Sequence, residues 1–160
     1  SANGLYSCGF YNSQHPHQTS NTHELALSVM FESGIQHWAD RPDSFYKLST
    51  AGKDFMRNVP VAWDEIYFVD GIPGDFVILA RRKGKDWYLA GINGSNFNRN
   101  FAVKLDFLSL GVKYKAKLFV DGLNINDIKE ESGLFIKSND IQVKCLPQGG
   151  FVAHFSVLEE

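Results

Sequence analysis

The sequence predicts a mainly β protein: an antiparallel eight-stranded β-sandwich of the Greek-key type, preceded by a short α/β segment. Three observations lead to this prediction. The chain has 160 residues, the size of one domain or of one domain with an appendage. Aromatic residues make up 14% of it, and their flat side chains pack well on the pleated surface of a strand. The hydrophobic period changes from helical to alternating near residue 60.

Residues 1–20 are polar and irregular, and helix signals begin directly after them. Asn21 is followed by Glu24 at the spacing of a capping box, so Asn21 is the expected N-cap. The run over 25–31 is apolar almost all round, which predicts a helix that is covered on more than one side. Residues 35–40 predict a short strand, and residues 42–59 a second helical stretch between two prolines.

The rest of the chain alternates with a period of two and is punctuated by turn residues. Eight strands are predicted, over residues 66–69, 76–82, 87–92, 101–107, 114–120, 134–137, 141–146 and 151–158. Asp70-Gly71 and residues 83–86 are expected to be turns, the second closing a clear hairpin, and residues 122–132 a polar connection. This number of strands in about 100 residues is typical of an antiparallel sandwich.

Composition excludes several function classes. The formal net charge of −2 gives no bulk attraction to nucleic acid or to an anionic membrane. No apolar run approaches the roughly 18 residues that span a bilayer.

Cys8 and Cys145 can form one disulfide at most, and their redox state is left open. Cys145 is expected to be a buried apolar residue of a strand. Because the chain opens without Met, we expect a processed or excised piece of a protein.

Two histidine motifs are candidate metal-binding sites. His15 and His17 lie two apart in an irregular loop, but a third ligand with plausible spacing is missing. His23-Glu24 resembles half of a zinc helix motif, yet Leu27 stands where the second histidine would be. The sequence therefore predicts no metal site in this chain.

Three further motifs have competing structural and functional interpretations. Asp64 and Glu65 are adjacent, so on a strand they point to opposite faces and cannot act as an acid/base pair. The cations of residues 81–85 favour a solvated hairpin turn over a phosphate site. Trp87-Tyr88 offers Trp87 as a candidate sugar-stacking platform, although one of the two must face the core of a sandwich.

Beyond these motifs, the sequence resembles glycoside hydrolase family 97 from about residue 9 to its end. The resemblance rests on the segments TSNTHELALSV (19–29), FESGIQHWAD (31–40), VPVAWDE (59–65), PGDF (73–76) and ARRKGKDWY (80–88), in that order and spacing. Members of the family are bacterial α-glycosidases that act on α-glucosides or α-galactosides and are typically exported. The resemblance therefore implies a periplasmic or secreted parent enzyme with an α-linked oligosaccharide as its substrate.

The resemblance also implies a division of the chain. Residues 1–60 look like the remnant of a (β/α)8 barrel, and residues 61–160 like the C-terminal sandwich, which is linked to barrel packing and oligomerisation. The partners expected are the remaining barrel and N-terminal domain of the parent and a second copy. The family's catalytic carboxylates, and the glutamates that hold calcium in its inverting branch, lie upstream. No catalytic residue is therefore assigned, calcium is expected only in the parent, and the isolated chain is expected to be inactive.

His37 and Asp40 are the candidate substrate-rim residues. If residues 35–38 form the last barrel strand, the loop that follows lies on the active face, which is built from such loops. The alternative is that the two side chains only brace the end of the strand. Both interpretations stay open at the level of sequence.

Two other functions remain open. The first is a carbohydrate-binding sandwich module that uses exposed aromatics such as Trp87 or Trp38. The second is a self-association module in which the helix over 25–31 presents an exposed apolar patch. That patch would consist of Leu25, Leu27, Val29, Met30 and Phe31. Substrate choice, retention or inversion of configuration, and oligomeric state are not encoded in these residues.

Overall fold

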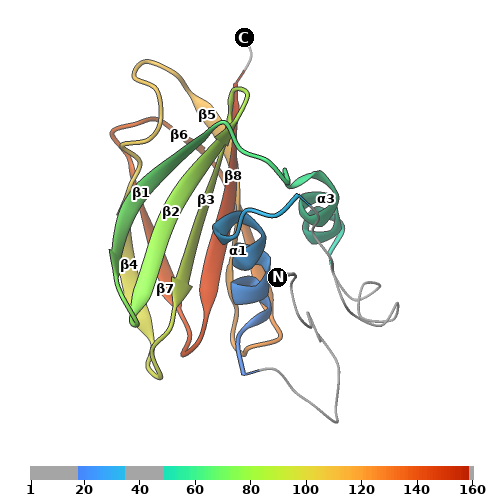
Figure 1. Cartoon of the computed structure of the whole chain (residues 1–160), viewed down its shortest axis with the longest axis vertical. Coiled ribbons are helices and arrows are strands. Elements are labelled where there is room, and N and C mark those ends of the chain that lie inside the picture. Colours follow the sequence, from blue (N-terminus) through green and yellow to red (C-terminus); the bar gives the residue numbers. More distant parts are fainter. Residues whose placement is uncertain (1–17, 35–48, 159–160) are drawn as a thin grey trace.

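The computed structural model describes residues 18–34 and 49–158, and these form three layers (Figure 1). A pair of helices lies against one face of a six-stranded sheet, and a two-stranded sheet covers the other face. None of the helices in the described ranges is long and apolar enough to cross a membrane.

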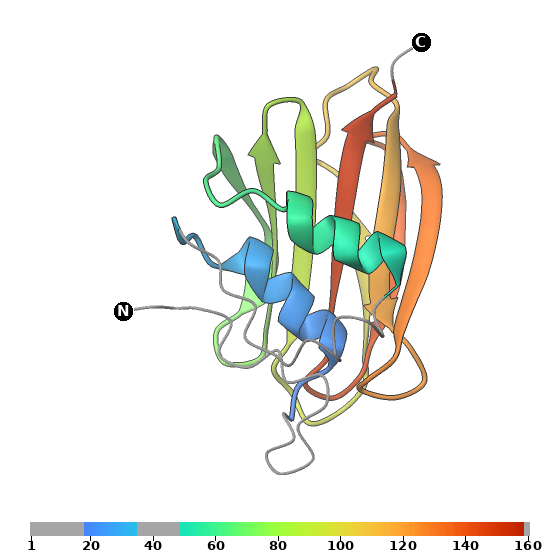
Figure 2. The same ribbon diagram turned by 90° about the vertical axis from the view of Figure 1, so that its right-hand side faces the viewer.

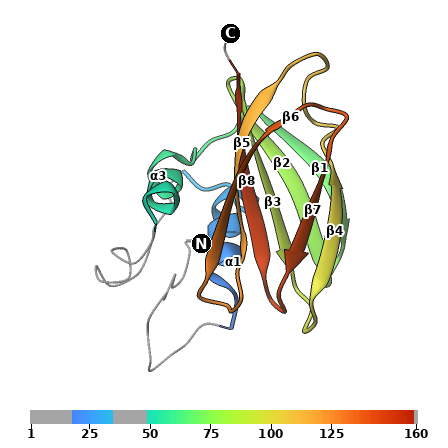
Figure 3. The ribbon, with the colours of Figure 1, turned by 180° about the vertical axis from the view of Figure 1, so that it is seen from behind.

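All eight strands pair with antiparallel neighbours. They are β1 (Glu65–Ile72), β2 (Phe76–Lys83), β3 (Asp86–Asn93), β4 (Arg99–Lys104), β5 (Tyr114–Asp121), β6 (Ile128–Phe135), β7 (Asp140–Cys145) and β8 (Gly150–Val157). The large sheet has the order β1-β2-β3-β8-β5-β6, and β4 pairs with β7 in the small one (Figure 3). Because the chain crosses between sheets and β8 inserts between β3 and β5, the topology is that of a β-sandwich.

The main core lies between the two sheets and is rich in aromatic rings. Alternate residues of β3 and β8 point into it, including Trp87, Leu89 and Phe155. The ring centroid of Phe107 lies 5.2 Å from that of Trp87 and 5.7 Å from that of Phe155, in tilted and edge-on geometries that aromatic pairs prefer. The high aromatic content of the sequence is thus explained by the sandwich interior.

A second core lies on the outer face of the large sheet, beneath helices α1 (Asn21–Met30) and α3 (Thr50–Asn58) (Figure 2). Leu25 and Val29 of α1 are fully buried against this face. From α3, Phe55 places its ring 5.4 Å from the ring of Phe119 on β5. Since each fully buried Leu, Val or Phe stabilises the fold by about 2 kcal/mol, the helices are integral to the sandwich.

The covered helix corrects the expectation of an exposed patch over 25–31. Leu25, Val29 and Met30 are buried, Leu27 is half-buried, and only Phe31 is exposed. The helix is apolar almost all round because it packs on the large sheet. This helix therefore offers no apolar surface for self-association.

Helix α1 begins one residue earlier than the sequence predicts, and α3 forms within the stretch predicted over 42–59, of which residues 42–48 lie outside the described residues. The N-cap of α1 is Ser20, whose side chain accepts from the backbone N–H of His23, while Asn21 is already helical. Helix α3 begins after Ser49, whose side chain accepts from the N–H of Gly52. The strand predicted over 35–40 lies outside the described residues.

Two strand boundaries also differ. Asp70-Gly71 is not a turn, because it lies within β1 at a bulge, and the chain turns at residues 73–75 instead. Strand β6 begins at Ile128, inside the stretch predicted as a connection. It is an edge strand with mostly exposed charged side chains, so it lacks the apolar alternation by which strands are recognised.

Gly91 gives a direct test of the packing between β3 and β8. An ideal Cβ at this position would lie 2.1 Å from the ring of Phe151, which pairs with Gly91 across the two strands. We expect Gly91→Ala to lower the free energy of unfolding by about 2 kcal/mol, because the ring must move within a packed core. Urea unfolding followed by circular dichroism measures this. Gly34→Ala is the matched control, since a Cβ there meets nothing within 4 Å. Equal midpoints for the two variants would contradict this packing.

Candidate functional site

A buried carboxylate joins the N-terminus of α1 to the end of β5. Asp121 is the last residue of β5, and the Ser20 hydroxyl donates to its Oδ1 at 2.5 Å. Its Oδ2 accepts from the backbone N–H of Leu146 at 2.8 Å and of Gly150 at 3.1 Å. One side chain therefore ties the first turn of the helix to the turn between β7 and β8.

The backbone of the turn between β7 and β8 lets this turn lie close to Ser20 and to the Asp121 carboxylate. Gln148 adopts a positive φ of 53°, and its carbonyl accepts from the N–H of Ser20 at 3.1 Å. An ideal Cβ on Gly149 would lie 2.0 Å from Oδ2 of Asp121, so a larger residue cannot occupy this position without displacing the carboxylate. The Gly149 carbonyl in turn accepts from Nδ1 of His23 at 3.1 Å.

The electrostatics of this cluster follow from its burial. Desolvation raises the pKa of the Asp121 carboxyl above its ordinary value, and the hydrogen bonds from Ser20, Leu146 and Gly150 oppose that rise. The positive end of the α1 dipole also favours the carboxylate. Burial lowers the pKa of His23 below 6.5, against the opposing charge of Glu24. At neutral pH the His23 ring is therefore uncharged and keeps the Nδ1 proton that it donates to Gly149.

A buried cation holds the opposite end of the same helix. Nη2 of Arg81, on β2, donates to the carbonyl of Met30, the last residue of α1, at 2.9 Å. Its Nη1 lies 3.6 Å from the carboxylate of Glu32, and the guanidinium lies 5.8 Å from the ring centroid of Trp63. A cation at a helix C-terminus complements the negative end of the dipole. The sandwich thus provides a carboxylate at one end of α1 and a guanidinium at the other.

A groove runs between α3 and strands β3, β5 and β8 of the large sheet. It has a volume of about 320 Å³ and is lined by Ala51, Asp54, Phe55, Asn58, Tyr88, Lys115, Lys117, Phe119, His154 and Ser156. The ring of His154 stacks on Tyr88 at 4.4 Å, and its Nε2 lies 2.8 Å from a carboxylate oxygen of Asp86. Burial raises the pKa of Tyr88 to about 12, so its hydroxyl stays protonated. These contacts fix the side chains of Tyr88, His154 and Asp86 in place at the wall of the groove.

Metal ligation finds no support in the described part of the chain. Within residues 18–34 and 49–158, no group of three or more His, Cys, Asp or Glu side chains is placed to hold a metal ion. His23, half of the zinc-like motif, is part of the Asp121 cluster instead. His15 and His17 lie outside the described residues.

Trp87 is not available as a sugar-stacking platform. Only 5% of it is exposed, because it packs in the main core. Its neighbour Tyr88 is buried as well, in the second core. The sequence argument allowed one of the two to reach solvent, and it was wrong because the large sheet is covered on both faces. The rim candidates His37 and Asp40 lie outside the described residues, as does Trp38, so these predictions stay untested by the structure.

The carboxylates of the β1–β2 region are structural, as the sequence predicts. Oδ2 of Asp64 accepts from the N–H of Gly84 at 2.7 Å, and Oδ1 from Nζ of Lys83 at 3.2 Å. Glu65 forms a 2.9 Å ion pair with Arg82. These contacts bind the start of β1 to the β2–β3 hairpin.

The burial of three further residues, Cys145, Arg81 and Asp121, was predictable from the sequence to different degrees. Cys145 is fully buried, as expected, and desolvation raises the pKa of its thiol. The sequence predicts that Arg81 is solvated like the other cations of the hairpin. In the structure its side chain is buried. Asp121 lies between the strand predicted over 114–120 and the connection predicted over 122–132. No local signal distinguishes these two residues, because their partners lie on a helix far away in the sequence.

Comparison with known proteins identifies the sandwich. The family model described as "Glycosyl-hydrolase 97 C-terminal, oligomerisation" matches residues 62–156. A retaining alpha-galactosidase of Bacteroides thetaiotaomicron is 36% identical over 140 residues, which are 84% of this chain and 20% of that protein. A probable retaining alpha-galactosidase of Streptomyces bingchenggensis is 39% identical over 82 residues, or 51% of this chain and 13% of that protein.

Solved structures agree with these relatives. A glycoside hydrolase family 97 enzyme from Pseudoalteromonas sp. strain K8, in complex with acarbose, superimposes with a TM-score of 0.82 at 32% identity. The match covers 89% of this chain and 23% of that one. The chain thus spans about a fifth of the length of the curated enzyme from Bacteroides. Because the family model covers more than half of the residues, the chain belongs to glycoside hydrolase family 97, of which it carries the C-terminal oligomerisation domain.

Proposed function

We propose that this chain is the C-terminal region of an exported α-glycosidase, in which the sandwich seats the end of the catalytic barrel and associates with a second copy. The observation that carries the proposal is the attachment of α1 to the sheet. Asp121 and Arg81 hold the two ends of this helix, and the second core lies beneath it. A sandwich that depends on helices preceding it in this way serves as their structural support.

The substrate class follows from the relatives. The two curated enzymes are named as a retaining and a probable retaining alpha-galactosidase, which favours α-galactosidic bonds. The family 97 enzyme from Pseudoalteromonas sp. strain K8 is found in complex with panose and with acarbose, which favours an oligosaccharide as the substrate. We propose hydrolysis of α-galactosidic or α-glucosidic bonds by the parent enzyme, in the periplasm or outside the cell.

The chemistry of hydrolysis belongs to the parent barrel. Glycoside hydrolysis uses two carboxyl groups flanking the scissile bond, and a (β/α)8 barrel takes about 250 residues. In this proposal residues 1–60 supply only the end of that barrel, with His37 and Asp40 on its substrate rim. Among the described residues, no group of three or more His, Cys, Asp or Glu side chains is placed to hold a metal ion. We propose that any calcium of the parent is bound upstream, as the family resemblance implies.

Asp121 tests the attachment of α1 to the sandwich. We expect Asp121→Ala to lower the free energy of unfolding of the chain by about 3 kcal/mol, because three buried donors lose their acceptor. Chemical denaturation at pH 7 measures the change. Asp106→Ala is the control, since Asp106 is an exposed aspartate of a loop. A loss below about 0.5 kcal/mol in Asp121→Ala would show that this cluster does not hold the helix.

Hydrolysis assays test the assignment to a parent enzyme. We expect the full-length protein that contains this chain to release nitrophenol from nitrophenyl α-galactoside or α-glucoside, and the purified 160-residue chain to release none. Turnover by the isolated chain would place the catalytic groups within these residues and overturn the proposal. Failure of the folded full-length protein to cleave either substrate would overturn the substrate class.

A further inference from the structure

The faces of the large sheet are both covered, so its edges are the remaining surfaces for association. Helices cover the outer face and the small sheet covers the inner face. The edge strands are β1 and β6. An edge strand presents unpaired backbone N–H and C=O groups, and proteins protect such edges with charged side chains or proline.

The two edge strands differ in the side chains that they expose: a run of charged residues on β6, and mainly apolar residues on β1, which also has the bulge between Phe68 and Asp70. Lys129, Glu130 and Glu131 are exposed or half-exposed along β6, and Lys129 forms a 2.8 Å ion pair with Glu131. Strand β1 is also eight residues long but has no lysine, arginine or proline. Its exposed side chains are mainly apolar: Ile66 is 55% exposed, Phe68 64% and Ile72 54%.

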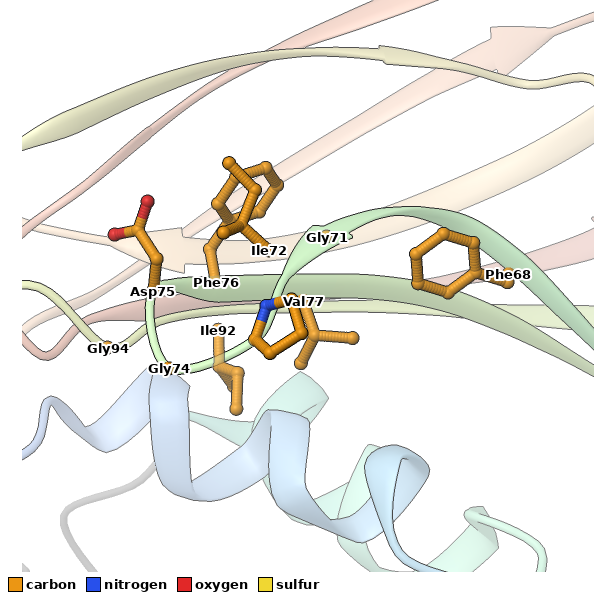
Figure 4. Close-up of a pocket in the computed structure, with 10 residues that line it drawn as sticks. Phe68, Gly71, Ile72, Gly74, Asp75, Phe76, Val77, Ile92 and Gly94 are labelled. Atoms are coloured by element: carbon orange, nitrogen blue, oxygen red, sulfur yellow. The ribbon is translucent and has the colours of Figure 1, made fainter.

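A hollow of about 430 Å³ extends this apolar surface from β1 onto the sheet (Figure 4). Phe68 and Ile72 line it from β1, and Val77 and Ile92 from β2 and β3. Figure 4 shows Val77 and Ile92 on the side of the sheet that faces the helices, with Phe68 further along β1. The exposed patch and the hollow form one continuous apolar surface, of the kind that marks protein–protein contacts.

The charges near β1 permit contact between two identical strands. Glu65 is already paired with Arg82, and Asp70 accepts from the N–H of Gly71 at 2.8 Å. If two β1 strands lie antiparallel about a two-fold axis at Phe68, the bulge between Phe68 and Asp70 places Asp70 of one strand beside Tyr67 of the other. No two like charges then stand opposite each other, so the strand is self-complementary.

We propose that β1 is the edge through which two copies of this chain associate, with Phe68 near the two-fold axis. The inference deepens the proposed self-association and rests on it. The matched oligomerisation domain spans residues 62–156, which include β1 and exclude both helices. Of the two edge strands of the large sheet, β1 exposes mainly apolar side chains, whereas β6 exposes Leu134 beside mainly charged and polar ones. The partner is a second copy, and pairing along β1 joins the two large sheets into one.

Size-exclusion chromatography with light scattering tests this interface. We expect the wild-type chain to have the mass of a dimer at micromolar concentration and Phe68→Glu to be a monomer, with a dissociation constant raised at least 100-fold. The side chain of Phe68 is mostly exposed, so the thermal unfolding of the variant should match that of the wild type. Leu110→Glu and Leu123→Glu are the controls, since these residues are 88% and 96% exposed outside β1. Both should remain dimers.

Mixing two variants with opposite charges at residue 68 tests the interface by restoring the dimer. Near a two-fold axis residue 68 meets its own copy, so Phe68→Glu and Phe68→Lys should form a heterodimer when mixed although each is a monomer alone. A folded Phe68→Glu that remains a dimer would overturn the β1 interface while leaving self-association intact. A wild-type chain that is monomeric at every concentration would overturn the self-association on which the inference rests.

Discussion

The structure depends on the way α1 is fixed between two buried charges of opposite sign. Asp121 meets the positive end of the helix dipole and Arg81 the negative end, and both charges come from strands of the large sheet. The helix supplies the Ser20 hydroxyl to Asp121 and the Met30 carbonyl to Arg81, so each charge loses one partner without it. The apolar residues between the two ends then close the second core.

This arrangement determines which surfaces are available for function. Helices lie on one face of the large sheet and β4 and β7 on the other, so Trp87 and Tyr88 are buried on opposite sides of it. In the account proposed here, two copies associate through an edge strand of the large sheet. Charge protects β6, whereas β1 exposes apolar side chains next to an apolar hollow. A domain matched as an oligomerisation unit therefore presents its most apolar edge to a partner.

Much of this fold was predictable because its signals are local. The alternation of β4 and β7 and the turn between β2 and β3 predicted strands close to those observed. The choice of Ser20 over Asn21 as the N-cap was not predictable, since both residues cap well. The distant carboxylate of Asp121 decides between them by accepting from the Ser20 hydroxyl. Likewise, Arg81 resembles its exposed neighbours until the end of α1 is brought against it. The rim candidates His37 and Asp40 stay predictions.

Native-state hydrogen exchange tests most directly whether α1 and the large sheet are one cooperative unit. We predict that the amides at the centre of α1, such as that of Val29, exchange with the same free energy of opening as those of β3 and β8. Loss of the helix would expose the second core to solvent and remove one hydrogen-bond partner each from Asp121 and Arg81, so we expect the sheet to unfold together with the helix. Rapid exchange throughout α1 while β3 and β8 keep full protection would contradict this structural dependence.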